Sequence, residues 1–135
     1  LEMARPSFRY LLVDLAPGFN AISIAAAEAS EKVYLTTMAD GTFEMKHLQR
    51  AMEIFRSLDN WQQRLGCVIT RMTPDVRRAK ELEEEIGCPV TLIPNEYLLC
   101  SIAANNGRMA VDIGSGSLLT QQIDRMAFAI HGEGR

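Results

Sequence analysis

Residues 10–18 of the chain read Tyr-Leu-Leu-Val-Asp-Leu-Ala-Pro-Gly, an apolar run that ends in an acid, a proline and a glycine. The run from Tyr10 to Val13 is apolar without interruption, which is typical of a strand covered on both faces in a parallel sheet. Asp14 ends the run, and Pro17 and Gly18 then break it. An acid in this position holds Mg²⁺ or orients water in some phosphate-handling enzymes, but more often it caps the next helix or solvates the loop.

Downstream of this stretch, short apolar runs alternate with longer amphipathic segments. Apolar and β-branched runs predict three further strands, at residues 32–37, 66–70 and 88–93. Helical spacing and Gly, Asn or Pro boundaries predict helices over residues 21–30, 43–58, 74–86, 95–105 and 118–130, with a Gly/Asn-rich loop at 106–117. This alternation predicts an α/β fold with flanking helices around a mostly parallel sheet of about four strands, in a doubly wound arrangement. No linker or repeat divides the chain, so residues 1–135 are expected to form a single unit.

Composition and charge exclude several classes of protein. With 135 residues, 47% hydrophobic and 23% charged, the chain lies near the globular average, unlike collagenous, disulfide-rich or disordered chains. No apolar run approaches the ~18–20 residues of a membrane span, so no transmembrane segment is expected. A net charge of −3 argues against a nucleic-acid partner.

The cysteines and histidines predict no metal or disulfide site. Cys67, Cys88 and Cys100 are widely spaced, and the first two lie in strand-like runs where a reduced thiol behaves as a small buried hydrophobe. This usage favours a cytoplasmic location. With only His47 and His131 in the chain, a histidine-based catalytic or metal site is not expected.

The order of these segments resembles the ParA/MinD-type deviant Walker ATPases, which have a P-loop NTPase fold. An apolar strand ending in Asp-x-x-Pro-Gly, followed by an Ala-rich helix, is similar to the family's switch region. Val68-Ile69-Thr70-Arg71 resembles the Thr-Arg end of a later strand, and Leu92-Ile93-Pro94-Asn95 resembles the segment that borders the nucleotide base. The resemblance covers about residues 8–130. Residues 103–109, Ala-Ala-Asn-Asn-Gly-Arg-Met, are similar to the CpaE/TadZ branch, whose members assemble Flp-type (tight-adherence) pili.

This resemblance implies roles for residues at three strand ends. Asp14 would be the catalytic and metal-binding acid, on the Mg²⁺ and water side of the site, and Pro17 and Gly18 would shape the switch loop beside the γ-phosphate. The base-side residues would flank the adenine, with Pro94 and Asn95 on one side and Thr70 and Arg71 on the other. Ordinary turn chemistry after buried strands explains the base-side residues equally well.

A phosphate loop is missing from the sequence. Neither Gly-x-x-x-x-Gly-Lys-[Ser/Thr] nor Lys-Gly-Gly-x-Gly-Lys occurs, and the only lysines, Lys32, Lys46 and Lys80, follow no glycine loop. Phosphates would therefore lack both a nest of backbone N–H groups and a lysine. The resemblance thus implies the C-terminal portion of a nucleotide domain, with ATP and Mg²⁺ belonging to the intact parent and no activity in this portion alone. A start at Leu1-Glu2 rather than Met is expected for part of a longer protein.

The family's phosphate-loop strand lies between the strands expected at residues 10–14 and 32–37. Without it, the backbone edges of those two strands need another partner, either each other or another chain. Self-association of the chain is therefore predicted.

The resemblance implies a nucleotide-responsive scaffold for pilus assembly or polar localisation, rather than a metabolic enzyme. Its partners would be proteins of a pilus or secretion machinery, and its location cytoplasmic, with polar or membrane placement through those partners. The alternative is a competent ATPase whose phosphate loop lies upstream. A response-regulator receiver is also an α/β domain, but the chain lacks its acidic pair and its strand-ending lysine.

Overall fold

A computed structural model describes residues 5–38, 42–57 and 60–133 of the chain. The start of the chain at Leu1-Glu2 lies outside these ranges. Within them, every helix is too short or too polar to cross a bilayer.

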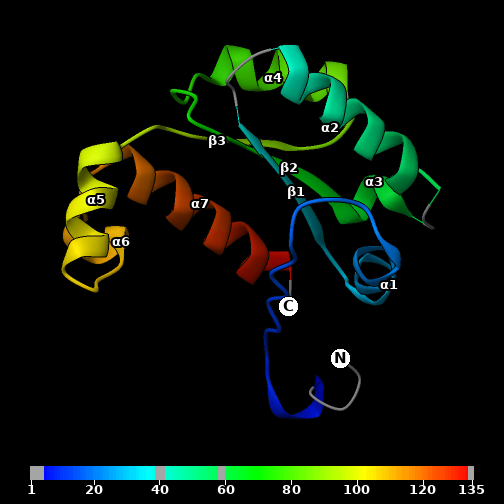
Figure 1. The fold of residues 1–135 in the computed structure, drawn as a ribbon, viewed down its shortest axis with the longest axis horizontal. Helices are drawn as coiled ribbons and strands as arrows, with labels where there is room; N and C mark the ends of the chain where they lie inside the picture. The colour runs from blue at the N-terminus through cyan, green and yellow to red at the C-terminus, as the bar shows by residue number, and fades with distance from the viewer. Residues whose placement is uncertain (1–4, 39–41, 58–59, 134–135) are drawn as a thin grey trace.

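A parallel sheet of three strands lies at the centre of the fold (Figure 1). The strands are β1 (Val33–Met38), β2 (Leu65–Thr70) and β3 (Val90–Ile93), and they lie side by side in that order. The middle strand β2 is buried from Leu65 to Ile69, as expected for a strand covered on both faces. The register pairs Thr70 with Met38 on one side and with Ile93 on the other, so all three strands end at one edge of the sheet.

The prediction of a strand at residues 10–14 is wrong, and in the described part of the chain the sheet has three strands rather than four. Residues 8–20 form an irregular, drawn-out segment, shown in blue in Figure 1, and their side chains are exposed. An apolar run becomes a strand only where a neighbouring strand takes up its backbone N–H and C=O groups. A groove separates this segment from β1, so the backbone groups of the two segments do not form strand hydrogen bonds with each other.

The five predicted helices are confirmed to within a few residues at their ends. They are α1 (Ala21–Ala29), α2 (Thr42–Phe55), α4 (Val76–Ile86), α5 (Tyr97–Asn105) and α7 (Leu118–Glu133). Three short elements were not predicted: the 3-10 turn η1 (Arg5–Ser7), α3 (Trp61–Arg64) and α6 (Ala110–Ile113). The last of these lies inside the segment predicted as a loop. Figure 1 shows α2 and α4 over one face of the sheet, with α1 and α7 on the other side.

The main core lies between the sheet and the pair α2 and α4. Its buried side chains include Leu48, Met52, Phe55, Ile69, Leu82 and Ile86. Leu48, Met52 and Phe55 recur at helical spacing along α2 and form one buried stripe. Hydrophobic burial of these side chains, at about 25 cal/mol per Å² of apolar surface, is the main force that holds the two layers together.

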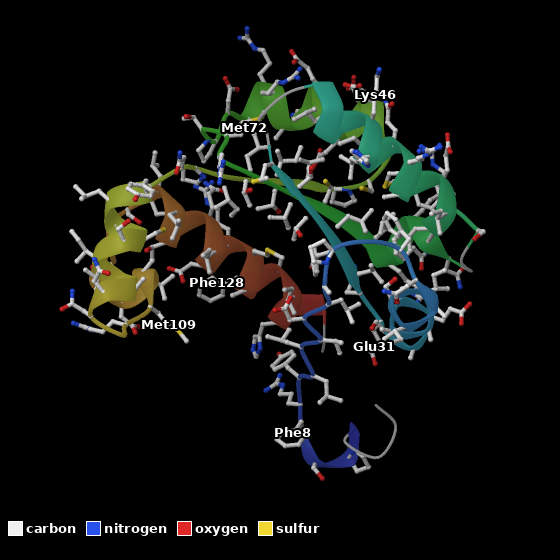
Figure 2. All side chains as sticks on the ribbon, viewed as in Figure 1. Phe8, Glu31, Lys46, Met72, Met109 and Phe128 are labelled. Atoms are coloured by element: carbon white, nitrogen blue, oxygen red, sulfur yellow. The ribbon has the colours of Figure 1, made fainter. Side chains whose placement is uncertain are left out.

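Among its described residues, the C-terminal helix α7 has fully buried side chains only at its beginning. Leu119 and Thr120 are buried there and α7 contacts β3, but further along the helix Phe128 is 76% exposed. Figure 2 shows the ring of Phe128 pointing away from the sheet. The second half of α7 therefore exposes Phe128 on one face, while Met126 and Ile130 are half-buried.

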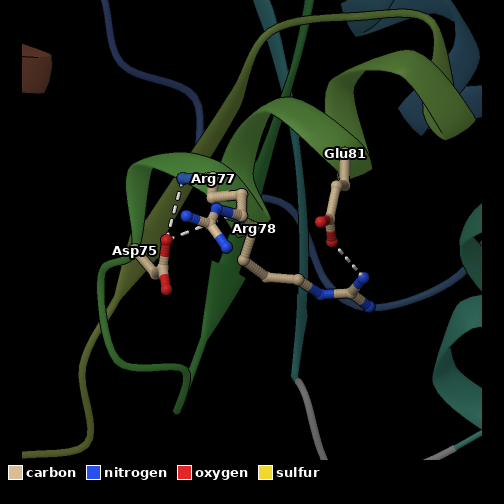
Figure 3. A network of polar contacts seen from close by, with 4 residues as sticks. All are labelled: Asp75, Arg77, Arg78 and Glu81. Carbon is tan, nitrogen blue, oxygen red and sulfur yellow. Dashed lines mark hydrogen bonds and ion pairs between the residues drawn. The ribbon is translucent and has the colours of Figure 1, made fainter.

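Helix α4 has a capped start and a solvated charged face (Figure 3). The carboxylate of Asp75 accepts hydrogen bonds from the backbone N–H of Arg77 at 2.8 Å and of Arg78 at 3.3 Å. The exposed Arg78 and Glu81 side chains form an ion pair at 3.1 Å. A satisfied helix start contributes more to stability than an exposed ion pair, because water screens the pair.

Asp75→Ala is expected to lower the free energy of unfolding by about 1 kcal/mol, because two N–H groups of the first turn lose their acceptor. Chemical denaturation followed by circular dichroism measures the change. Glu81→Gln is the control on the same helix, expected to change stability by less than ~0.5 kcal/mol. An equal loss in both variants would contradict the capping role.

Two of the three cysteines are buried, as predicted, and Cys100 is exposed. Burial, with Cys88 nearby, raises the pKa of the Cys67 thiol from 9.0 to about 12. Burial, assisted by Glu83 and opposed by Arg56, raises the pKa of Cys88 from 9.0 to about 11. The folded chain keeps both protons above pH 9.0, where the unfolded chain loses them. Stability is therefore expected to fall as the pH rises from about 9 through the folded pKa values.

The buried thiols are expected to resist alkylation in the folded chain, because the thiolate is the reactive form and both sites are closed to solvent. Iodoacetamide at pH 8 should add one label to the native chain, at Cys100, and three after denaturation. Mass spectrometry of the intact chain and its peptides counts the labels. Native labelling of Cys67 or Cys88 as fast as Cys100 would contradict this protection.

Candidate functional site

The four base-side residues lie together at the C-terminal edge of the sheet. Because Thr70 pairs with Ile93, the residues that follow β2 and β3 are neighbours. The Thr70 hydroxyl donates to the Thr37 carbonyl at 3.1 Å, and the Met72 N–H donates to the Ile93 carbonyl at 3.1 Å. These bonds tie the ends of the three strands to one another.

Of these four residues, Arg71 and Asn95 have exposed side chains. Arg71 has a φ of 62°, a left-handed conformation that is uncommon for a residue with a side chain. Pro94 is buried, and Thr70 is half-buried. The structure therefore brings the four predicted base-side residues to one place, with one polar and one basic side chain accessible.

A carboxylate that sequence reasoning missed fixes the segment after β3. The Glu96 carboxylate accepts a hydrogen bond from the Leu119 N–H at 3.1 Å, at the start of α7. The Ser117 hydroxyl accepts from the Thr120 N–H at 3.0 Å in the same turn. The end of the loop at residues 106–117 thus caps α7. A Ser three residues before Thr120, ahead of an apolar run, was the sequence signal that could have predicted this cap.

The phosphate-side residues lie in a different place. Asp14, Pro17 and Gly18 are exposed in the irregular segment before α1, and Gly18 has a φ of +111°, which favours glycine. Two contacts hold this segment at its ends. The Tyr10 hydroxyl and His131 Nδ1 lie 2.6 Å apart, and the Phe19 and Phe55 rings meet edge-on at 5.8 Å.

A groove of about 1010 Å³ lies between this segment and β1. Residues 8–19 form one wall, residues 33–36 of β1 form the facing wall, and α1 closes part of the groove. The lining includes Asp14, Pro17 and Gly18 but none of the four base-side residues. The structure therefore does not join the two predicted groups into one site.

Helix α1 is held in the wall of the groove by an arginine from α3. The Arg64 guanidinium donates to the carbonyls of Ala27 at 2.5 Å, Glu28 at 3.2 Å and Ser30 at 2.6 Å. The last turn of α1 contains no basic residue of its own. Arg64 therefore supplies the positive charge that the C-terminal end of a helix favours.

The described residues do not by themselves fit Mg²⁺-ATP. In the described ranges no group of three His, Cys, Asp or Glu side chains comes close enough to hold a metal ion. Lys32 lies at the start of β1, where its Nζ donates to the Gln63 carbonyl at 2.8 Å. Among the residues that the structure describes, neither a phosphate nest with its lysine nor a full set of oxygen ligands is assembled around Asp14.

Comparison with known proteins shows the fold. No protein-family model matches the chain, and no curated protein matches it in sequence. The structure is similar to the crystal structure of a ParA family ATPase from Chlorobium tepidum TLS, with a TM-score of 0.77 and 16% identity. The match covers 94% of this chain and 53% of the solved one, so the chain spans about half the length of that ATPase. The three-stranded sheet with its helices thus has the fold of part of a ParA ATPase.

Proposed function

We propose that this chain is part of a ParA/MinD-like nucleotide domain of the CpaE/TadZ type, acting as a nucleotide-responsive scaffold in pilus assembly or polar localisation. The observation that carries the proposal is the fold of half a ParA ATPase with the Asp-x-x-Pro-Gly segment beside β1. The pilus branch rests on the Ala-Ala-Asn-Asn-Gly pattern of residues 103–107. In this proposal the output is protein contact rather than turnover of a metabolite.

The proposal gives each group of predicted residues a task in the intact parent. Thr70, Arg71, Pro94 and Asn95 would form the base side, and their common edge supports this role. Asp14 would lie on the Mg²⁺ and water side, while Pro17 and Gly18 would shape a loop that responds to the γ-phosphate. A segment upstream of this chain would supply the phosphate loop. The base-side residues and the residues on the phosphate side, Asp14, Pro17 and Gly18, would then face the same nucleotide.

Titration with fluorescent ATP and Mg²⁺ tests the nucleotide part of the proposal. The 135-residue chain is expected to show no tight Mg²⁺-dependent binding, and a chain extended upstream in its gene is expected to bind. In the extended chain, Asp14→Asn should weaken the Mg²⁺-dependent component, whereas the exposed Asp124→Asn on α7 should leave it unchanged. Tight binding by the short chain alone would show that the site is complete without an upstream loop.

Phosphate release by the extended chain separates the scaffold from the alternative, a competent ATPase. A Gly-Lys-Ser/Thr loop upstream together with sustained phosphate release favours the ATPase. Binding without release favours the scaffold. For the pilus role, loss of surface pili on deleting the parent gene, restored by the wild-type gene, is the expected result. Normal piliation in the deletion strain would contradict that role.

A further inference from the structure

Helix α4 carries its charged side chains in an order that opposes the dipole of the helix. Its basic residues lie in the first half and its acidic residues in the second half: Arg77, Arg78 and Lys80, then Glu81, Glu83, Glu84 and Glu85. The N-terminal end of a helix carries a partial positive charge and the C-terminal end a partial negative charge. The order present in α4 therefore lowers the stability of the single chain relative to the reverse order.

Four of these residues form one exposed stripe along the helix, the α4 stripe. They are Arg77, Lys80, Glu81 and Glu84, whose spacing of i, i+3, i+4 and i+7 places them on one helix face. The residues that α4 buries lie on its opposite side. Glu81 pairs with Arg78 within the helix. In the described part of the chain, the other three side chains of the stripe have no ion-pair partner.

The α4 stripe lies away from the groove beside β1, where the proposed function places the strand of an upstream phosphate loop. Helix α4 contacts β3, which is the strand of the sheet farthest from β1 and its groove. None of the described residues that line the groove belongs to α4. In Figure 1, α4 lies on the opposite side of the sheet from α7. An upstream strand in the groove therefore leaves the α4 stripe exposed.

We propose that the α4 stripe binds the α4 stripe of a second copy of this chain, with the two helices antiparallel about a two-fold axis. The axis passes between Lys80 and Glu81. Arg77 of each copy then faces Glu84 of the other copy, and Lys80 of each copy faces Glu81 of the other. A parallel pair of helices would place like charges opposite each other instead. A contact of this isologous kind closes at two copies.

Charge complementarity of this kind determines the orientation of the dimer and its salt dependence more than its strength. Each ion pair is exposed and contributes little, because water screens it. The order of charges that is unfavourable in one helix becomes favourable across the pair, where the two helix dipoles run antiparallel. The dimer is therefore weak and separates when salt screens the charges. It is independent of nucleotide binding, so the ATP titration neither supports nor weakens it.

Reversing single charges of the α4 stripe tests the dimer. Arg77→Glu places two acids opposite each other, and Glu84→Arg places two bases opposite each other, each at two symmetric positions. Both substitutions bring the charges of α4 into line with the helix dipole, so each variant is expected to fold as the wild type does. The control is Arg125→Glu, which makes the same chemical change at an exposed position of α7.

Sedimentation of the wild-type chain and of Arg125→Glu in low salt should give a mass that rises from 15.0 kDa toward twice that value as the protein concentration increases to about 1 mM. Raising the salt to ~0.5 M should return the mass to that of one chain. Arg77→Glu alone and Glu84→Arg alone should each weaken association at least ~10-fold.

An equimolar mixture of these two variants should associate again, because every contact between the unlike chains then joins opposite charges. The double variant with both substitutions should also associate. A residue that acted only within its own chain would produce neither recovery. Circular dichroism should show the same helix content in all variants, so that a lost dimer is not mistaken for unfolding.

A wild-type chain whose mass stays at 15.0 kDa up to about 1 mM in low salt would overturn the proposal. Single variants that associate as tightly as the control would contradict it, as would a mixture that associates no better than its components. Association that strengthens with salt would indicate an apolar contact, such as one through the exposed Tyr97 and Leu98 of α5, and would also overturn it.

Discussion

Replacing Leu82 with alanine is expected to lower the free energy of unfolding by about 2–5 kcal/mol. Leu82 is 1% exposed and belongs to the core that joins α4 to the sheet. The substitution removes buried methyl groups and leaves a cavity that the surrounding side chains fill only in part, so the loss exceeds the transfer free energy alone. Urea denaturation monitored by the fluorescence of Trp61 and by circular dichroism measures it.

Leu98→Ala is the matched control, because it makes the same chemical change in another helix. Leu98 on α5 is 72% exposed, so its truncation is expected to alter stability by less than ~0.5 kcal/mol. A loss above ~2 kcal/mol in this control would mean that the face of α5 is covered in solution. Similar small losses in both variants would contradict the packing of α4 on the sheet.

Arg64→Ala is expected to lower the free energy of unfolding by about 2–3 kcal/mol, which is large for a partly exposed side chain. The side chain donates to three carbonyls at the end of α1, and hydrogen bonds from a charged donor are stronger than those between neutral groups. Water can hydrogen-bond to the carbonyls that lose Arg64, so the expected loss of stability is smaller than the sum of three charged hydrogen bonds.

Arg64→Lys separates charge from geometry, because lysine keeps the positive charge but lacks the planar fork of donors. It should recover only part of the lost stability. The exposed Arg77→Ala on α4 controls for the loss of a surface arginine and should change stability by less than ~0.5 kcal/mol. Hydrogen exchange should show faster exchange of α1 in Arg64→Ala. Unchanged exchange there would contradict the role of Arg64 in holding this helix.

The sequence predicted the strands that have neighbours. The runs that became β1, β2 and β3 are apolar or β-branched, and β1 and β2 are each followed by a crossover helix that covers the sheet. Their common C-terminal edge also follows from the parallel arrangement, so the shared position of Thr70, Arg71, Pro94 and Asn95 was predictable. The composition of residues 10–14 is just as suitable for a strand, but no strand lies beside them.

Contacts between distant segments were beyond sequence reasoning. Arg64 binds carbonyls more than thirty residues earlier in the chain, and Glu96 accepts from an N–H 23 residues later. Nothing in the local pattern of either residue identifies its partner. The short helices α3 and α6 were missed for a related reason, since four residues are too few to show a helical period.

The sequence by itself determined the α/β alternation, the buried faces of the helices and the lack of a phosphate-loop motif, because periodicity and residue type encode burial and local chemistry. Only the tertiary structure decided that residues 10–15 stand apart from β1, with a groove of about 1010 Å³ between them. A sequence pattern specifies which side chains avoid water, whereas a backbone hydrogen bond also needs a second strand at the right distance. Residues 10–15 therefore have the composition of a strand but form none here, because a strand requires a neighbouring strand to pair with.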